Sequence, residues 1–447
     1  MKRSTRYYLL SLGCAKNTVD AEGMAQLLGQ AGYTGVDDPA RAHVLIVNTC
    51  GFIDAAREES LQHLRELAAG KKRRQLLIAA GCLAQFWGPR LAEQVPGLDG
   101  IIGTRRWMDI VDFVERVGSR PKPGPLYHLP DEARTVGADE KGVTCAAVNG
   151  ASAYLKVADG CRRRCAFCSI RLIKGAAVSR PPQVIAAEAR MLVERGVREL
   201  ILIAQDLTDY GHDLGIRDGL PTLIESILGA APELHWLRLM YTYPGAVSER
   251  LIEVMATHPQ AVHYLDMPLQ HAHPAVLRRM RRPASLEWIH KMLDKLRTAM
   301  PDVAVRTTFI VGYPGETEDE FQALLDFVRE VQFDRLGAFS YSFEPGTPSA
   351  GLADHVPEEI KQERYERLME AQQAISLRKN QALVGQTLEV LIEGCGDGLA
   401  VGRSYRDAPE IDGLVLLGDE SLPPGQFVPA VITGAAAYDL YGQIESK

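Results

Sequence analysis

Three cysteines on one short stretch of the chain have the spacing to hold an iron–sulfur cluster. Cys161, Cys165 and Cys168 are separated by four and three positions. Three thiolates on a four-iron cluster leave one iron open, and an open iron can chelate the amino and carboxylate groups of S-adenosylmethionine. The alternative is a structural zinc site, although such sites take four ligands and the stretch has no fourth Cys or His nearby.

Three further cysteines, Cys14, Cys50 and Cys82, are far apart in the sequence, but each follows a short apolar run. We predict that these runs are strands and that they cover residues 7–12, 43–48 and 76–80. Helical patterns follow each run, which predicts an open parallel α/β sheet whose strands end at one shared edge. The three thiols are expected together at that edge, while any one of them alone is more often a buried structural residue.

A longer alternation of strand and helix patterns follows, and it predicts a partial (β/α) barrel. Its six predicted strands cover residues 153–157, 199–204, 236–240, 262–267, 305–311 and 335–341. The loop of Cys161 directly follows the first of them. A charged helix is predicted over 357–382, and alternating apolar runs at 388–392, 413–417 and 427–432 then predict a small antiparallel β-barrel.

The chain of 447 residues is about three times the usual domain length, so several domains are expected. We place the boundaries by composition: an α/β domain at 1–117, a linker rich in Gly, Pro and charge at 118–150, the partial barrel at 151–382 and the small barrel at 383–447.

The composition is that of an ordinary globular protein without a membrane-spanning run. The basic N-terminus leads into Gly13 and Cys14 rather than a cleavage site, so a cytoplasmic location is expected. In a reducing compartment cysteines are more often metal ligands than disulfides. Cys145 and Cys395 match no motif and are interpreted as structural or incidental.

The loop of residues 159–168, with an aromatic residue before its last cysteine, resembles that of the radical S-adenosylmethionine (SAM) superfamily. This resemblance implies five residues that contact SAM: Phe167 near the adenine, Gln205 and Asp206 at the methionine amino group, and Gly312 and Glu316 near the adenosine. From the residues alone, Asp206 could cap a helix and Gly312 could serve turn geometry.

The three predicted domains together resemble the radical SAM methylthiotransferases over nearly the whole chain. Stretches 11–17, 47–52 and 81–85 are similar to the three ligand motifs of that family. The resemblance implies that Cys14, Cys50 and Cys82 hold a second 4Fe–4S cluster, which carries the sulfur to be inserted, and that the small barrel is TRAM-like. One SAM would give the methyl group and another the radical that opens an unreactive C–H bond.

Known branches of this family act on tRNA adenosines or on an aspartate of the small-subunit ribosomal protein numbered twelve. Stretches 205–211, 265–272 and above all 406–413 resemble the second branch. From Val384 onward ten acidic and three basic residues give a net charge of −7, which favours a basic protein over tRNA phosphate, although surface acid often only aids solubility.

We therefore expect β-methylthiolation of that aspartate, with an electron donor of the flavodoxin or ferredoxin type and a sulfur source as partners. The alternatives are a tRNA adenosine methylthiotransferase and a non-catalytic, zinc-stabilised ribosome-binding protein. No side chain beyond the cluster ligands needs to act as nucleophile. Arg180 is a candidate for steering a carboxylate or sulfur species, because guanidinium suits planar anions, but it could equally be an ion-pair partner. The cations Arg162 to Arg164 and Lys174 depart from the family pattern.

Overall fold

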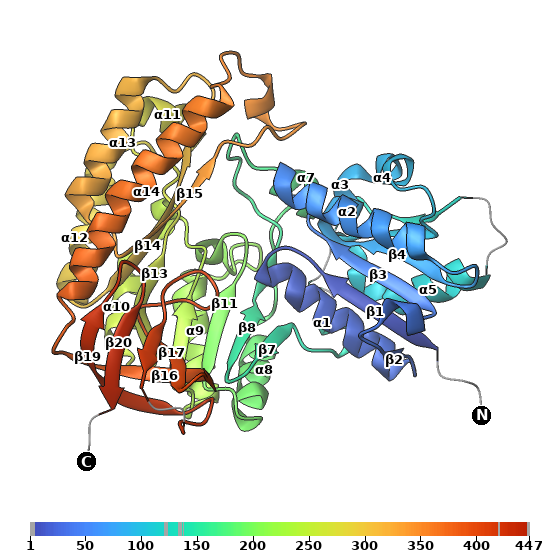
Figure 1. The fold of residues 1–447 in the computed structure, drawn as a ribbon, viewed down its shortest axis with the longest axis horizontal. Helices are drawn as coiled ribbons and strands as arrows, with labels where there is room; N and C mark the ends of the chain where they lie inside the picture. The colour runs from blue at the N-terminus through green and yellow to red at the C-terminus, as the bar shows by residue number, and fades with distance from the viewer. Residues whose placement is uncertain (1–4, 120–123, 133–135, 137, 419–420, 445–447) are drawn as a thin grey trace.

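The computed structural model describes residues 5–119, 124–132, 136, 138–418 and 421–444. The N-terminal α/β domain forms one lobe, and the partial barrel and the C-terminal barrel form the other (Figure 1). The three-part architecture predicted from the sequence is confirmed. Within the described residues, no helix has both the length and the apolar character needed to cross a membrane.

The N-terminal domain is built on a parallel six-stranded sheet of order β2-β1-β3-β4-β5-β6. Its strands are β1 (Arg6–Ser11), β2 (Thr34–Gly35), β3 (Val44–Thr49), β4 (Leu76–Ala80), β5 (Gly100–Gly103) and β6 (Leu126–His128). Its helices are α1 (Ala15–Gln30), α2 (Asp54–Gly70), α3 (Gly81–Trp87), α4 (Pro89–Gln94) and α5 (Ile110–Ser119). Every residue of β3 is buried, which explains why its first four residues form a continuous apolar run rather than an alternating pattern.

The central domain is a seven-stranded sheet of order β15-β14-β13-β12-β11-β8-β7, parallel except for β7. Its strands are β7 (Ala146–Asn149), β8 (Ser152–Lys156), β11 (Glu199–Ile203), β12 (Trp236–Leu239), β13 (Ala261–Asp266), β14 (Ala304–Val311) and β15 (Arg335–Ser340). Its helices are α6 (Ala138–Lys141), α7 (Ile170–Lys174), α8 (Pro182–Glu194), α9 (Gly219–Ala230), α10 (Glu249–Thr257), α11 (Pro274–Arg279), α12 (Leu286–Ala299), α13 (Glu318–Val331) and α14 (Glu358–Gln381). A short hairpin of β9 (Ala158–Asp159) and β10 (Val178–Ser179) brackets the cysteine loop. The six predicted parallel strands are therefore all present.

Local sequence sets where these helices begin. In α13 the hydroxyl of Thr317 accepts from the backbone N–H of Glu320, whose carboxylate accepts from the N–H of Thr317. This reciprocal cap satisfies two donors that a helix start would otherwise leave free.

The two faces of the central sheet pack differently. One face packs against helices α8, α9, α10, α12, α13 and α14 in a large apolar core. On the other face, Ile201, Ile203 and Tyr264 share a core with Val19 and Met24 of α1. The N-terminal domain is thus anchored on the sheet by its first helix, which begins directly after Cys14.

The C-terminal domain is a closed barrel of order β16-β17-β18-β20-β19. Its strands are β16 (Thr387–Gly396), β17 (Leu399–Ser404), β18 (Val415–Leu417), β19 (Phe427–Ala435) and β20 (Leu440–Ile444). The prediction of an antiparallel barrel needs one correction, because β18 and β20 pair in parallel. β20 lies between β18 and β19 and pairs with both, which closes the barrel.

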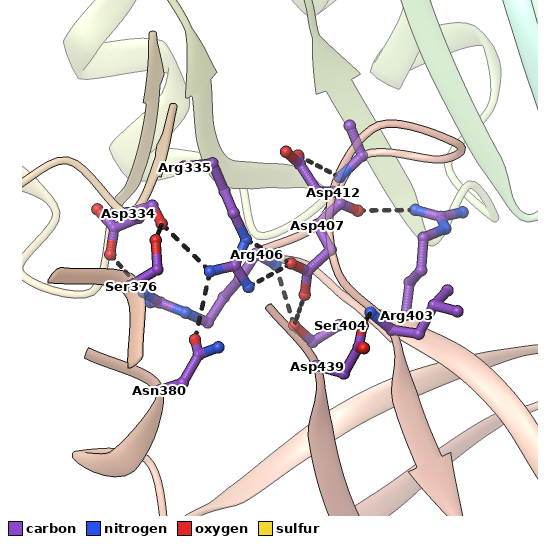
Figure 2. A network of polar contacts seen from close by, with 12 residues as sticks. Asp334, Arg335, Ser376, Asn380, Arg403, Ser404, Arg406, Asp407, Asp412 and Asp439 are labelled. Atoms are coloured by element: carbon purple, nitrogen blue, oxygen red, sulfur yellow. Dashed lines mark hydrogen bonds and ion pairs between the residues drawn. The ribbon is translucent and has the colours of Figure 1, made fainter. Parts of the chain in front are cut away.

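A buried polar network fastens the small barrel to the central sheet (Figure 2). Arg335 donates to Asp407 at 2.5 Å, Arg406 donates to Asp334 at 2.6 Å, and Arg306 lies 3.2 Å from Asp412. These side chains are at least four-fifths buried. The stretch 406–413 is therefore an internal dock between two domains.

Described residues of the predicted linker 118–150 take part in both sheets. β6 extends the N-terminal sheet beside β5, and β7 forms the antiparallel edge of the central sheet beside β8. Edge strands this short carry little apolar periodicity, because only one neighbouring strand and one face fix their pattern.

Candidate cluster-binding sites

The three N-terminal cysteines converge at the carboxyl edge of the first sheet. Cys14 lies between β1 and α1, Cys50 follows β3, and Cys82 is the second residue of α3, directly after β4. Cys14 is exposed, whereas Cys50 and Cys82 are buried. This arrangement agrees with the prediction that the three distant thiols lie together at one sheet edge.

Two glycines allow these turns to come close. A Cβ on Gly13 would lie 2.7 Å from the Cβ of Cys50 and 2.9 Å from its sulfur, and a Cβ on Gly81 would lie 2.7 Å from the carbonyl oxygen of Thr49. Both glycines have a φ of +93°, in the left-handed region that favours glycine. No larger residue fits at either position without moving a cysteine-bearing turn.

Side-chain amides join the three turns. Asn17 donates to the carbonyl oxygens of Leu12, at 2.9 Å, and Thr49, at 3.1 Å, and its own oxygen accepts from the Cys82 thiol at 3.4 Å. Asn48 donates back to the carbonyl of Asn17 at 2.7 Å. From the sequence we assigned no role to Asn17 or Asn48. Both residues lie inside cysteine motifs, and this position is the signal that could have identified them.

Burial governs the protonation of these thiols. It raises the pKa of Cys50, and it raises the pKa of Cys82 to about 12. The Lys174 ammonium acts in the opposite direction on Cys82. Since a cysteine must lose its proton to ligate a metal, cluster binding at this edge would release protons.

The second triad lies on the loop between β9 and α7. Cys161, Cys165 and Cys168 are each half-buried, and burial raises the pKa of Cys161 to about 11 and that of Cys168 to about 12. The loop is fixed by its backbone, since the N–H of Cys161 donates to Gly175 at 3.2 Å and that of Ala166 donates to Met280 at 2.9 Å.

Cations surround this loop. The guanidinium of Arg282 lies 3.7 Å from the Cys165 sulfur, and the backbone N–H of Arg163 lies 3.4 Å from the Cys161 sulfur. Arg163 and Arg282 both stack on the Tyr243 ring, at 4.0 and 4.3 Å from its centroid. Positive charge near sulfur favours thiolate over thiol, which suits a metal-binding loop.

Two of the five expected SAM contacts follow β11. The side-chain oxygen of Gln205 is buried and accepts no hydrogen bond from the described residues, so it is free to accept one from a ligand amine. Asp206 is engaged already, because its carboxylate accepts from Arg163 at 2.7 Å and from the Thr208 hydroxyl at 2.6 Å.

The other three lie around the end of β14. Glu316 is fully used within the protein: it accepts from the N–H groups of Gly312 and Tyr313 at 3.1 and 3.3 Å and pairs with Arg364 at 2.8 Å. A Cβ on Gly312 would meet Lys361 at 2.3 Å, so this glycine makes room for α14. Phe167 packs on the apolar cluster that contains Tyr313. These contacts shape the turn, and Glu316 has no spare oxygen for a ligand.

Arg180 does not face either triad as a free cation. Its guanidinium pairs with Asp139 at 2.8 Å and Glu188 at 2.5 Å, donates to the carbonyl of Lys156, and is 1% exposed. The ion-pair interpretation of this residue fits the structure, and the steering role does not, because its donors are already engaged.

Each cysteine triad offers three thiolate ligands to a metal centre. Among the described residues, no three Cys, His, Asp or Glu side chains converge closely enough to hold a single metal ion. A four-iron cluster binds each thiolate on a different iron, so its ligands need not meet at one point. The three thiols of each triad lie within electrostatic range of one another.

Comparisons with known proteins agree with this geometry. Residues 155–328 match the radical SAM superfamily, 384–444 match the TRAM domain and 6–103 match a family described as "Uncharacterized protein family UPF0004". The structure resembles that of the radical SAM methyltransferase TsrM from Kitasatospora setae, with a TM-score of 0.56, 15% identity and coverage of 77% of this chain and 75% of that one. At that identity the likeness concerns the fold alone.

The family matches define a radical SAM enzyme, a class that uses an iron–sulfur cluster and SAM, and the curated relatives below are methylthiotransferases of this class. The ribosomal protein uS12 methylthiotransferase RimO of Chloroflexus aurantiacus is 50% identical, over 98% of this chain and 99% of that protein. The protein of the same name from a Roseiflexus species is 47% identical over 98% and 97%. The chain belongs to the RimO family, and the resemblance predicted from its sequence motifs is confirmed.

Proposed function

We propose that this enzyme adds a methylthio group to the β-carbon of an aspartate on ribosomal protein uS12, and that it does so with two 4Fe–4S clusters. The observation that carries the proposal is the convergence of Cys14, Cys50 and Cys82 on the side of the N-terminal domain that packs on the radical SAM barrel. Curated relatives of nearly the same length are named for methylthiolation of uS12.

In this proposal Cys161, Cys165 and Cys168 hold the cluster that binds SAM, and the N-terminal triad holds a second one. When bound, a cluster with an open iron supplies the electron that breaks the sulfonium bond of SAM, and the second cluster supplies the sulfur. Acid–base groups cannot open the C–H bond at the β-carbon of an aspartate near neutral pH. The protein side chains hold and orient the bound groups, and they exclude water from the site.

The residues of the barrel are arranged to hold SAM. Gln205 offers a buried oxygen that has no hydrogen-bond partner among the described residues, and the stacked Arg163 and Arg282 keep cations beside the cysteine loop. Phe167 adds an aromatic surface at the end of β14. We propose that Asp206, Gly312 and Glu316 shape this region of the barrel rather than contact SAM. The Asp206 carboxylate accepts from Arg163, Lys361 fills the space beside Gly312, and Glu316 pairs with Arg364.

The acidic charge of the C-terminal barrel supports a basic substrate less than its total suggests. Asp407 and Asp412 pair with Arg335 and Arg306 inside the domain dock, and Glu393 pairs with Arg403 at 2.7 Å. The acids that remain on the surface still disfavour tRNA phosphate. A uS12 substrate also implies that the enzyme works where ribosomes are assembled, in the cytoplasm.

The first experiment measures iron and labile sulfide in anaerobically reconstituted protein. We expect about eight irons in the wild type and about four in each triple variant, Cys14→Ala/Cys50→Ala/Cys82→Ala and Cys161→Ala/Cys165→Ala/Cys168→Ala. Cys145→Ala is a matched control, because Cys145 is also buried but belongs to no triad. An N-terminal triple variant that keeps all its iron would refute the two-cluster proposal.

The second experiment identifies the substrate. Reconstituted enzyme, SAM, sulfide and a reductant are incubated with either uS12 or tRNA, and the products are analysed by mass spectrometry. The proposal predicts one methylthio group on an aspartate of uS12 and none on tRNA. Modified adenosine with unmodified uS12 would establish the tRNA branch and leave the radical chemistry intact.

A further inference from the structure

Lys16 is a buried cation with no acidic partner. It lies in the first turn of α1, two residues after Cys14, and is 7% exposed. Its ammonium lies 3.2 Å from the centroid of the Tyr241 ring, on the loop after β12. Among the described residues, no carboxylate forms an ion pair with it. Lysine is rarely buried to this extent without a partner, because desolvation of the ammonium is unfavourable.

The acidic groups nearest to Lys16 are engaged elsewhere. Asp20 and Asp159 both pair with Lys156 and Lys174. Two carboxylates and two ammonium groups thus form a buried network that is neutral by itself, and it leaves no charge for Lys16.

Asp266, on the other side, is also fully used. Its Oδ1 accepts from Arg306 at 2.9 Å and its Oδ2 accepts from the backbone N–H of Tyr241 at 2.9 Å. The remaining acid of this region, Glu410, is exposed and acts on the Tyr241 ring only at electrostatic range. Lys16 is therefore a cation without a carboxylate ion-pair partner among the described residues, and the acidic group that acts on it most strongly, at electrostatic range, is the Cys14 thiol.

Backbone strain marks the same place. Tyr241 has a φ of +63°, in the left-handed region that an aromatic residue rarely adopts. The hydrogen bond from its N–H to Asp266 holds it there, and its carbonyl accepts from the N–H of Leu207 at 3.0 Å. Strain of this kind is retained where a side chain must be held in one position, and here it places the ring under the Lys16 ammonium.

We propose that Lys16 binds the side-chain carboxylate of the substrate aspartate, with the Tyr241 ring beneath the ion pair. This inference rests on the proposed function. Lys16 stands where the turn of Cys14 meets the carboxyl edge of the central sheet, and its ring partner Tyr241 is two residues from Tyr243, which stacks on Arg163 and Arg282 beside the second cysteine loop. The β-carbon is one bond from the carboxylate carbon, so a fixed carboxylate also fixes the C–H bond to be opened. Lys16 is thus a specificity-determining residue for an acidic side chain.

The test compares two peptides with the uS12 sequence around the modified residue, one with aspartate and one with asparagine at that position. The full-length, anaerobically reconstituted enzyme is used, and peptide binding, SAM binding and iron content are measured for each variant. We expect the wild type to bind the aspartate peptide at least about tenfold more tightly, the range for a hydrogen bond between charged groups. Lys16→Gln should remove this preference by weakening only the aspartate peptide, and Lys16→Arg should keep most of it.

Lys291→Gln is the control for loss of one positive charge, since Lys291 is an exposed residue of α12 paired with Glu287. It should leave the preference unchanged. The inference is overturned if Lys16→Gln still prefers the aspartate peptide, or if its only effects are lost iron or weaker SAM binding, which would make Lys16 a partner of those groups. If the wild type modifies neither uS12 nor the aspartate peptide, the proposed function itself fails, and the inference fails with it.

Discussion

The two cysteine sites are built in opposite ways. Cys161, Cys165 and Cys168 share one loop, whose backbone is held by Gly175 and Met280. Cys14, Cys50 and Cys82 come from three turns separated by more than thirty residues each, and they meet only because parallel strands end at one edge. The first site depends on local geometry, whereas the second depends on the packing of a whole domain.

The difference shows in the residues around each site. The barrel loop is half-buried and surrounded by arginines, which hold it by charge and stacking. The N-terminal site is joined by Asn17 and Asn48 and by glycines without room for a side chain. We infer that the N-terminal site is sensitive to small changes in packing and that the barrel loop tolerates changes at its rim.

The largest expected effect comes from Gly13→Ala. The new Cβ would lie 2.7 Å from that of Cys50, at a backbone φ of +93° that alanine rarely adopts. We expect the variant to lose about four of about eight irons and to keep the cluster of the barrel. Iron analysis with electron paramagnetic resonance of the reduced protein measures both.

Gly215→Ala is the matched control, because Gly215 also has a positive φ, of 72°, but has open space around it. Its iron content should equal that of the wild type. Equal iron in Gly13→Ala and the wild type would contradict the view that packing alone assembles the N-terminal site.

Asn17→Ala tests the amide that joins the three turns. The carbonyls of Leu12 and Thr49 would lose a buried donor, so we expect the free energy of unfolding of the metal-free protein to fall by about 2–3 kcal/mol. Denaturant titration measures the change. Asn149→Ala, at an exposed residue of β7, should change it by less than about 0.5 kcal/mol. A loss no larger than in that control would show that the turns are held by other contacts.

Thiol alkylation of the metal-free protein tests the pKa of Cys161 in the barrel loop. Burial raises the pKa of Cys161 to about 11, against the effect of the Arg163 N–H, so the thiol is protonated at neutral pH. Its thiolate fraction, and hence its alkylation rate, should rise about tenfold per pH unit from pH 7 to about pH 9. The alkylation rate of glutathione in the same sample should level off near its own pKa of about 8.5. Peptide mass spectrometry follows the rate. A plateau at the same pH as glutathione would show an unshifted thiol.

The smallest effect is expected for Arg162→Ala at the rim of the loop. The Arg162 side chain is 49% exposed and pairs with Asp209 at 2.5 Å. Exposed ion pairs contribute little, so stability should fall by less than about 1 kcal/mol and iron should be unchanged. Thermal unfolding and iron analysis check this. Arg163→Ala, which also removes the stack on Tyr243, should lower stability more. Loss of iron in Arg162→Ala would contradict the inference that the barrel loop tolerates changes at its rim.

The sequence alone determined the three strands that lead into Cys14, Cys50 and Cys82, the position of both triads and, by motif resemblance, the family. These follow from local pattern: an apolar run that ends in a cysteine turn predicts a strand end, and strand ends in a parallel sheet share an edge. The six central strands and α14 were predicted for the same reason, since each carries its own periodicity. Cys161, Cys165 and Cys168 are adjacent in the sequence, so no tertiary information was needed to group them.

Only the tertiary structure decided which charged residues are paired. Arg180 was a candidate for binding an anion, but Asp139 and Glu188 occupy its guanidinium. The stretch 406–413 was interpreted by its resemblance to the ribosomal-protein branch, and its Arg406, Asp407 and Asp412 side chains form a buried dock between two domains. The partner of a charge is set by long-range packing, which leaves no periodicity in the sequence, and for the same reason the unpaired Lys16 became visible only in the folded chain.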